Sequence, residues 1–227
     1  MQLLALLLGF VLLAGAGAVF LVKHDIGEHE PYRALWSAFG LGVAGIVAAL
    51  ILELVLLPPF STDGSTPFRA LAGVTLMIAV IEELVKCLPL LVLLYKKRYF
   101  NEHTDGVIYF AMAGLGFGLP ENLLYTMQYG LEVGMLRLLL TPMFHAATTA
   151  LIGYAFIRHK LDGLPTIKVV GVVAAVIGIH ALYDFGLFSG EPLLIILSLL
   201  ITASLGVGLL VLIRRARQRD RLMKRGK

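Results

Sequence analysis

The sequence has little charge and almost no cysteine. Charged residues make up 15% of its 227 residues, and Cys87 is the single cysteine. One cysteine excludes an intramolecular disulfide and leaves the redox compartment open. The low charge content, 59% hydrophobic residues and a mean hydropathy of +0.88 exclude an ordinary soluble domain. We therefore expect an all-α, polytopic membrane protein that is a bundle of helices.

No linker or low-complexity segment divides the chain, so we expect a single domain over residues 1–227. Apolar stretches of about 20 residues, the length that crosses a bilayer, recur along it. The first lacks the basic n-region of a signal peptide and is longer than its apolar region, so we interpret it as a retained helix. Together the stretches predict seven transmembrane helices, near 2–22, 34–57, 70–95, 106–128, 134–157, 167–188 and 192–213.

The fourth predicted helix contains GLGFGLPENLLY, with three glycines and a proline. Small residues let membrane helices approach one another closely. We therefore expect a neighbouring helix to pack tightly against this segment.

Lysine and arginine are distributed unequally between the two sides of this topology. One side receives sixteen of them, including the C-terminal segment RRARQRDRLMKRGK, and the other receives only Arg69 and Arg137. Cytoplasmic loops are rich in lysine and arginine, which predicts a cytoplasmic C-terminus and an extracytoplasmic N-terminus. A basic run beside a membrane helix is typical of contact with anionic lipid. We therefore expect the bilayer, and not nucleic acid, to be its partner.

Polar and charged side chains nevertheless occur inside four predicted helices. A charge at the bilayer centre costs at least about 2.5–3.5 kcal/mol and indicates function by default. A rise of about 1.5 Å per residue places these groups at matching depths, in the middle and outer half of the bilayer. We therefore expect the third to sixth helices to enclose one polar, water-accessible cavity. The residues concerned are Glu82, Glu83, Lys86, Glu121, Asn122, Tyr125, His145, His180 and Asp184.

Carboxylates outnumber cations in this set, which has Lys86 as its single lysine. Buried carboxylates without a cationic partner must be protonated or bind a cation. Histidine and carboxylate together favour a divalent metal, usually zinc. A metal-free site stays open, in which a glutamate is the general base and a histidine polarises the carbonyl. The expected metal ligands are Glu83, Glu121, His145 and His180.

Spacing along the helices suggests separate roles. Glu82 and Glu83 point about 100° apart on a helix, so we expect one to face the site and the other to pair with Lys86. His180 and Asp184, four residues apart, share a helix face, and we expect Asp184 to orient His180.

Some of these residues have simpler interpretations. Tyr125 is expected mainly to pack, and His145 taken alone could be a helix–helix hydrogen-bonding residue. Four further histidines are assigned to loops on the cytoplasmic side and are excluded from the site: His24, His29, His103 and His159.

Three short patterns occur in order, each on its own predicted helix. They are EExxK at 82–86, FxxxExxxY at 117–125 and HxxxD at 180–184. In this order they resemble the PrsW family of intramembrane proteases, which is distantly similar to CAAX prenyl endopeptidases and bacteriocin-processing membrane proteases. The resemblance covers about residues 70–188. It implies a metallo- or glutamate-dependent protease that cuts a membrane-anchored single-pass protein, such as an anti-sigma factor, near the extracytoplasmic side.

The resemblance also assigns residues. CAAX endopeptidases tend to have histidine where Glu121 stands, which argues against prenyl-protein processing. His145 lies outside the three patterns, and we include it for its depth and chemistry. We expect a multi-pass protein of a bacterial or archaeal plasma membrane, with substrate identity and oligomeric state left open. The expected catalytic residues are Glu82, Glu83, Glu121 and His180, supported by Lys86, Asp184, Tyr125 and Asn122.

Two other functions remain as alternatives. A proton- or cation-coupled transporter would use the same acids and histidines as a relay, although the sequence has no clear internal repeat of the kind that many transporters carry. A catalytically silent membrane scaffold is the third interpretation.

Overall fold

The computed structural model describes residues 2–23, 30–62 and 64–225, and in this part of the chain it contains helices and no strands. The all-α prediction is confirmed, and the described helices match the seven predicted ones in number and order. The helices are α1 Gln2–Lys23, α2 Tyr32–Leu56, α3 Phe68–Leu94, α4 His103–Tyr129, α5 Leu131–Asp162, α6 Thr166–Phe188 and α7 Pro192–Arg225.

Five of the described helices are long and apolar enough to cross a membrane: α2, α4, residues Leu140–Asp162 of α5, α6 and α7. The apolar stretch of α3 is interrupted by Glu82, Glu83 and Lys86. The seven-span topology and the orientation of the termini stay predictions.

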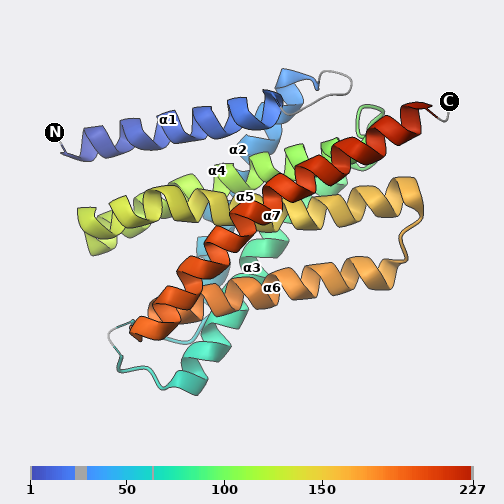
Figure 1. Cartoon of the computed structure of the whole chain (residues 1–227). Helices are drawn as coiled ribbons and strands as arrows, with labels where there is room; N and C mark the ends of the chain where they lie inside the picture. The colour runs from blue at the N-terminus through green and yellow to red at the C-terminus, as the bar shows by residue number, and fades with distance from the viewer. Residues whose placement is uncertain (1, 24–29, 63, 226–227) are drawn as a thin grey trace.

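Helices α4, α5 and α7 cross the middle of the molecule, with α1 on one side and α6 on the other (Figure 1). The closest approaches to α4 occur at its glycines. A side chain at Gly114 would overlap the carbonyl group of His145 in α5, and one at Gly116 would overlap the backbone of Phe39 in α2. The expected tight packing of a neighbour against this segment is therefore confirmed, and it brings His145 next to α4.

Several helices continue beyond their apolar stretches. The prediction that His103 and His159 lie in loops is wrong, because His103 begins α4 and His159 lies in the last turns of α5. Helix α4 starts early because Glu102 and Asp105 form a capping box at its N-terminus. Helix α5 continues to the left-handed residue Gly163, with φ of 67°. His24 and His29 lie outside the described residues.

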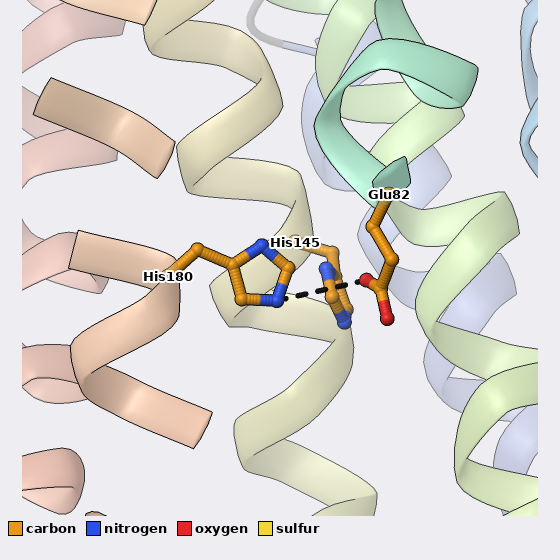
Figure 2. Close-up of side chains that lie close together, drawn as sticks. All are labelled: Glu82, His145 and His180. Carbon is orange, nitrogen blue, oxygen red and sulfur yellow. Dashed lines mark ion pairs between the residues drawn. The ribbon is translucent and has the colours of Figure 1, made fainter. Parts of the chain in front are cut away.

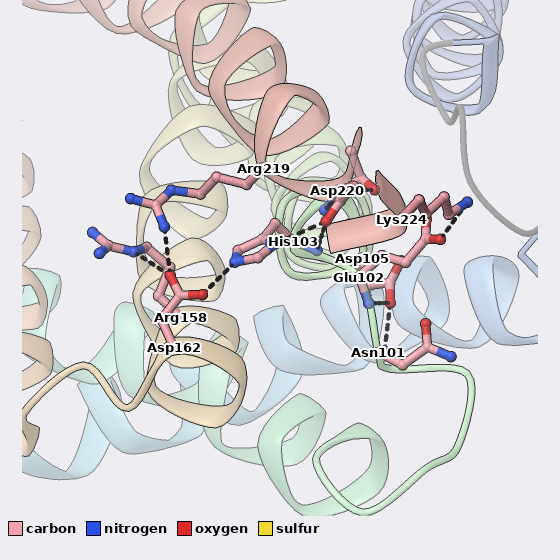
Figure 3. Close-up of polar contacts among 10 residues, drawn as sticks. Asn101, Glu102, His103, Asp105, Arg158, Asp162, Arg219, Asp220 and Lys224 are labelled. Carbon is pink, nitrogen blue, oxygen red and sulfur yellow. Dashed lines mark hydrogen bonds and ion pairs between the residues drawn. The ribbon is translucent and has the colours of Figure 1, made fainter. Parts of the chain in front are cut away.

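A polar network ties the start of α4 to the ends of α5 and α7 (Figure 3). The ring of His103 lies between two carboxylates, with Nδ1 2.8 Å from Asp220 Oδ1 and Nε2 2.9 Å from Asp162 Oδ1. The backbone N–H groups of His103 and Thr104 donate to the Asp220 carboxylate at 2.6 and 3.0 Å. Asp220 thus satisfies donors that the first turn of α4 leaves unpaired, and this contact holds the C-terminal part of α7 against the start of α4.

Candidate functional site

The three charged residues of α3 lie close together in the interior. Glu82, Glu83 and Lys86 are all buried. Lys86 Nζ lies 2.7 Å from Glu83 Oε1 and 3.6 Å from Glu82 Oε2. Glu83 is therefore the closer partner of the lysine, and Glu82 is the freer of the two glutamates.

A cavity of about 200 Å³ lies beside Glu82, between α2, α3 and α4. We call it the site cavity. Its carboxylates come from three helices: Glu53 of α2, Glu82 of α3 and Glu121 of α4. Glu83 is absent from the described residues that line it. Of the adjacent glutamates, Glu82 thus faces the space that water or a substrate could enter.

His180 of α6 reaches both glutamates of α3. Its Nδ1 lies 2.8 Å from Glu83 Oε1, and its Nε2 lies 3.6 Å from Glu82 Oε2 and 3.3 Å from Asp184 Oδ2. A neutral ring that donates its Nδ1–H to Glu83 keeps the Nε2 lone pair directed toward Glu82. This arrangement of carboxylate, histidine and free ring nitrogen is the one that orients histidine ligands in metal sites.

His145 of α5 connects the α3 charges to α4. Its Nδ1 lies 3.0 Å from Lys86 Nζ, and its Nε2 lies 2.5 Å from Glu121 Oε2. The other oxygen of Glu121 accepts a hydrogen bond of 2.7 Å from Arg137 Nη2. His145 is thus held on both sides of its ring, and Glu121 is held by His145 and Arg137.

Arg137 and Glu53 are residues that the sequence analysis missed. Arg137 was counted only among the basic residues of the extracytoplasmic side, but it is buried in α5 and pairs with Glu121. Each had a signal in the sequence, since both are charged residues within predicted transmembrane helices. A buried carboxylate such as Glu121 needs a cationic partner, and the residues selected from the sequence offered only Lys86, which pairs with the glutamates of α3.

Glu82, His145 and His180 converge from α3, α5 and α6 (Figure 2). Each offers one ligand atom, and these atoms all lie within 4.8 Å of one another. All three side chains are buried. Two histidines and one carboxylate form the ligand set of several zinc peptidases, so a divalent metal fits the chemistry of these donors.

Unpaired oxygens at the same place support this fit. Glu82 Oε2 and Asp184 Oδ2 are buried without a hydrogen-bond partner. An unsatisfied buried carboxylate oxygen is costly, and the ammonium of Lys86 lies 3.6 Å from Glu82 Oε2, beyond hydrogen-bond distance. A cation bound at this place would lower that cost. The converging group shares His145 and His180 with the ligand set expected from the sequence, but its carboxylate is Glu82 instead of Glu83 and Glu121.

The remaining predicted residues lie at the edge of this group. Asn122 donates through Nδ2 to the carbonyl oxygen of Gly134 at 3.4 Å, so it joins α4 to α5. Tyr125 stacks with Tyr129 and Phe188, as expected for a packing residue.

Comparisons with known proteins bear on this arrangement. The chain is 30% identical to the Protease PrsW of Bacillus subtilis (strain 168) over 130 residues, 57% of each chain. It is 31% identical to the Protease PrsW of Geobacillus kaustophilus (strain HTA426) over 136 residues, 60% of this chain and 58% of the relative. It is 29% identical to the Protease PrsW of Clostridioides difficile (strain 630) over 177 residues, which are 74% of this chain and 73% of the relative.

The match to the first two of these relatives thus covers less than two thirds of their length. No solved structure matches the chain significantly. The relatives are proteases by name, so the comparisons do not favour the transporter interpretation. Bacterial relatives and several apolar helices support a multi-pass integral membrane protein. The family described as PrsW family intramembrane metalloprotease matches residues 30–213, which hold the whole converging group, and the chain therefore belongs to that family.

Proposed function

We propose that the protein is an intramembrane protease that hydrolyses a peptide bond in a membrane-anchored, single-pass protein near the extracytoplasmic side of a bacterial plasma membrane. The observation that carries this proposal is the buried group of Glu82, His145 and His180 beside the site cavity. Its donor types suit peptide hydrolysis, and the names of the relatives support proteolysis. An anti-sigma factor is the substrate class that the family resemblance favours.

Glu82, His145 and His180 are the residues that would hold a divalent metal, with zinc as our proposed ion. His145 would bind it through Nδ1, in exchange for the contact of that nitrogen with Lys86 Nζ, so that the bond of its Nε2 to Glu121 is kept. A metal bound there supplies Lewis-acid polarisation of the scissile carbonyl and lowers the pKa of water. Glu83 accepts the Nδ1–H of His180 and fixes the orientation of that ring. Asp184, one helical turn further along α6, lies 3.3 Å from Nε2 of the same ring, so its carboxylate faces the place where the metal would bind.

Glu121 is our proposed water-orienting residue. Its carboxylate lines the site cavity, and its ion pair with Arg137 keeps it ionised, so that it can accept a hydrogen bond from water there. The bond from His145 to Glu121 then keeps this carboxylate and the ligand group in a fixed relation. In a metal-free mechanism Glu82 would take the role of the base, because it is the member of the glutamate pair that lines the cavity.

The test uses purified protein reconstituted in proteoliposomes with a bacterial single-pass anti-sigma factor. We expect wild-type protein to cleave it, and Glu82→Gln and His180→Ala to reduce the rate by at least about 100-fold. Glu191→Gln is the matched control, because Glu191 is an exposed carboxylate before α7. Cleavage by both site variants at the wild-type rate would sink the proposal. If the wild-type protein instead conducts ions without cleaving the substrate, and Glu82→Gln abolishes that ion flux, the transporter interpretation is supported.

A further inference from the structure

A second, larger cavity lies between the ends of α4, α5, α6 and α7. Its volume of about 340 Å³ falls within the range of about 300–1,000 Å³ for ligand pockets. We call it the lateral cavity. Much of its wall is aliphatic, with Leu140 from α5, Leu187 from α6, and Ile195 and Leu199 from α7. Its wall is therefore suited to an apolar group.

The lateral cavity and the site cavity share part of their walls. Thr62, Tyr125, Tyr129 and Phe188 line both of them. The ring of Tyr125 stacks on Tyr129 and on Phe188, with centroid distances of 5.6 and 6.3 Å. A chain segment that lies across these aromatic rings would therefore contact both cavities at once.

Arg137 links the lateral cavity to the site. It lines this cavity, and its guanidinium group lies 3.8 Å from the centroid of the Tyr125 ring. The same group donates to Glu121, which contacts His145. An occupant of the lateral cavity thus touches the residue that holds Glu121.

The polar groups of the wall distinguish between two kinds of apolar occupant. Tyr125, Tyr129, Tyr183 and Arg137 also line this cavity. Peptide groups can pair with tyrosine and arginine side chains, whereas a lipid acyl chain cannot. Together with the wall that it shares with the site cavity, this lining favours an apolar side chain carried on a peptide over a lipid tail.

We propose that the lateral cavity is a substrate-specificity pocket that receives a bulky apolar side chain, aromatic or branched aliphatic, next to the scissile bond. This inference rests on the proposed proteolytic function. It adds a requirement on the substrate: a large apolar residue stands at one fixed position beside the cut. It also assigns Leu140 and Leu199 to substrate selection.

The first test measures cleavage of a reporter series by cells that express the full chain. Each reporter is a single-pass membrane protein in which one position near the cut is Gly, Ala, Leu or Phe. We expect Leu and Phe to be cleaved at least about tenfold faster than Gly at one position, as burial of a large apolar group in a pocket predicts. Leu199→Trp fills the pocket and should shift that preference toward Gly and Ala.

Leu200→Trp is the matched control, because Leu200 neighbours Leu199 on α7 but is 59% exposed and absent from the described lining residues. We expect it to keep the wild-type preference. Efficient cleavage with no preference at any position, or the same change in both variants, would overturn the pocket assignment and leave the proteolytic function intact.

The second test needs no cleavage, so it separates failure of the pocket from failure of the proposed function. The photo-crosslinking residue p-benzoylphenylalanine replaces Leu140 in the His180→Ala protein, which is reconstituted with the Phe reporter. We expect a crosslink to the reporter that falls at least about fivefold with the Gly reporter. Crosslinks to lipid alone, or equal crosslinks to both reporters, would refute the proposal even if the protein is not a protease.

Discussion

The ion pair between Arg137 and Glu121 provides the most quantitative prediction. Both residues are nearly enclosed, with exposed fractions of 8% and 7%, and Arg137 Nη2 lies 2.7 Å from Glu121 Oε1. Removing one partner of a buried pair leaves an uncompensated charge and costs about 3–5 kcal/mol. The contact of Arg137 with the Tyr125 ring adds about 0.5–2 kcal/mol. We therefore expect Arg137→Met to lower the free energy of unfolding by about 3.5–7 kcal/mol.

The assay is equilibrium unfolding in mixed detergent micelles with increasing dodecyl sulfate, followed by circular dichroism. Arg137→Met, Glu121→Gln and the double variant are compared, so that their coupling can be measured. Arg137→Met leaves Glu121 with His145 alone, and Glu121→Gln leaves Arg137 without its carboxylate partner. The double variant should therefore be more stable than the sum of the single effects by about 1–3 kcal/mol. Arg69→Met, at an exposed position in α3, is the control and should change stability by less than about 0.5 kcal/mol. Additive single effects would refute the argument that the pair neutralises buried charge.

Three further predictions concern packing. Gly114→Ala should separate α4 from α5 and so lower both the stability of the protein and its affinity for zinc. Gly73→Ala is the control and should change neither, because the added methyl group meets no neighbour there. Equal zinc affinities in titrations of the two variants would contradict the close approach of the helices at Gly114. His103→Gln should release the C-terminal part of α7, because it removes a buried, charge-assisted contact. Trypsin should then cleave this part of α7 at least about tenfold faster than in the wild-type protein. His159→Gln is the control, and equal cleavage of the two variants would contradict the role of the polar network. Buried Cys87 should react with maleimide only on unfolding, and rapid labelling of the native protein would be inconsistent with its place in the core.

The fold was largely predictable because a bilayer imposes a simple requirement on the chain. Each crossing needs about 20 apolar residues with all backbone groups paired, so the apolar stretches matched the seven described helices. Helix ends were less predictable, because they depend on partners from elsewhere. The first turn of α4 is satisfied by Asp220, which lies more than a hundred residues further along the chain. No local pattern around His103 indicates that contact.

The site was predictable as a set of residues and not as a geometry. Ionisable residues inside predicted transmembrane helices pointed to Glu82, Glu83, His145 and His180 as candidates, because such residues are costly in a bilayer and indicate function by default. Which glutamate faces the site cavity depends on the rotation of α3 against α2 and α4, and a one-residue change turns a helix by about 100°. Arg137 was missed because it was counted among the basic residues of the extracytoplasmic loops, although it lies within α5 and pairs with Glu121.

Zinc binding by the purified full chain tests the central claim most directly. Elemental analysis after dialysis should find about one equivalent of zinc per wild-type chain. Glu82→Gln, His145→Ala and His180→Ala should each lose most of it, while Glu191→Gln should keep it. Chelation should abolish proteolysis, and added zinc should restore it. Wild-type protein that cleaves substrate without bound metal, or triad variants that retain full zinc occupancy, would contradict the assignment of Glu82, His145 and His180 as the metal site.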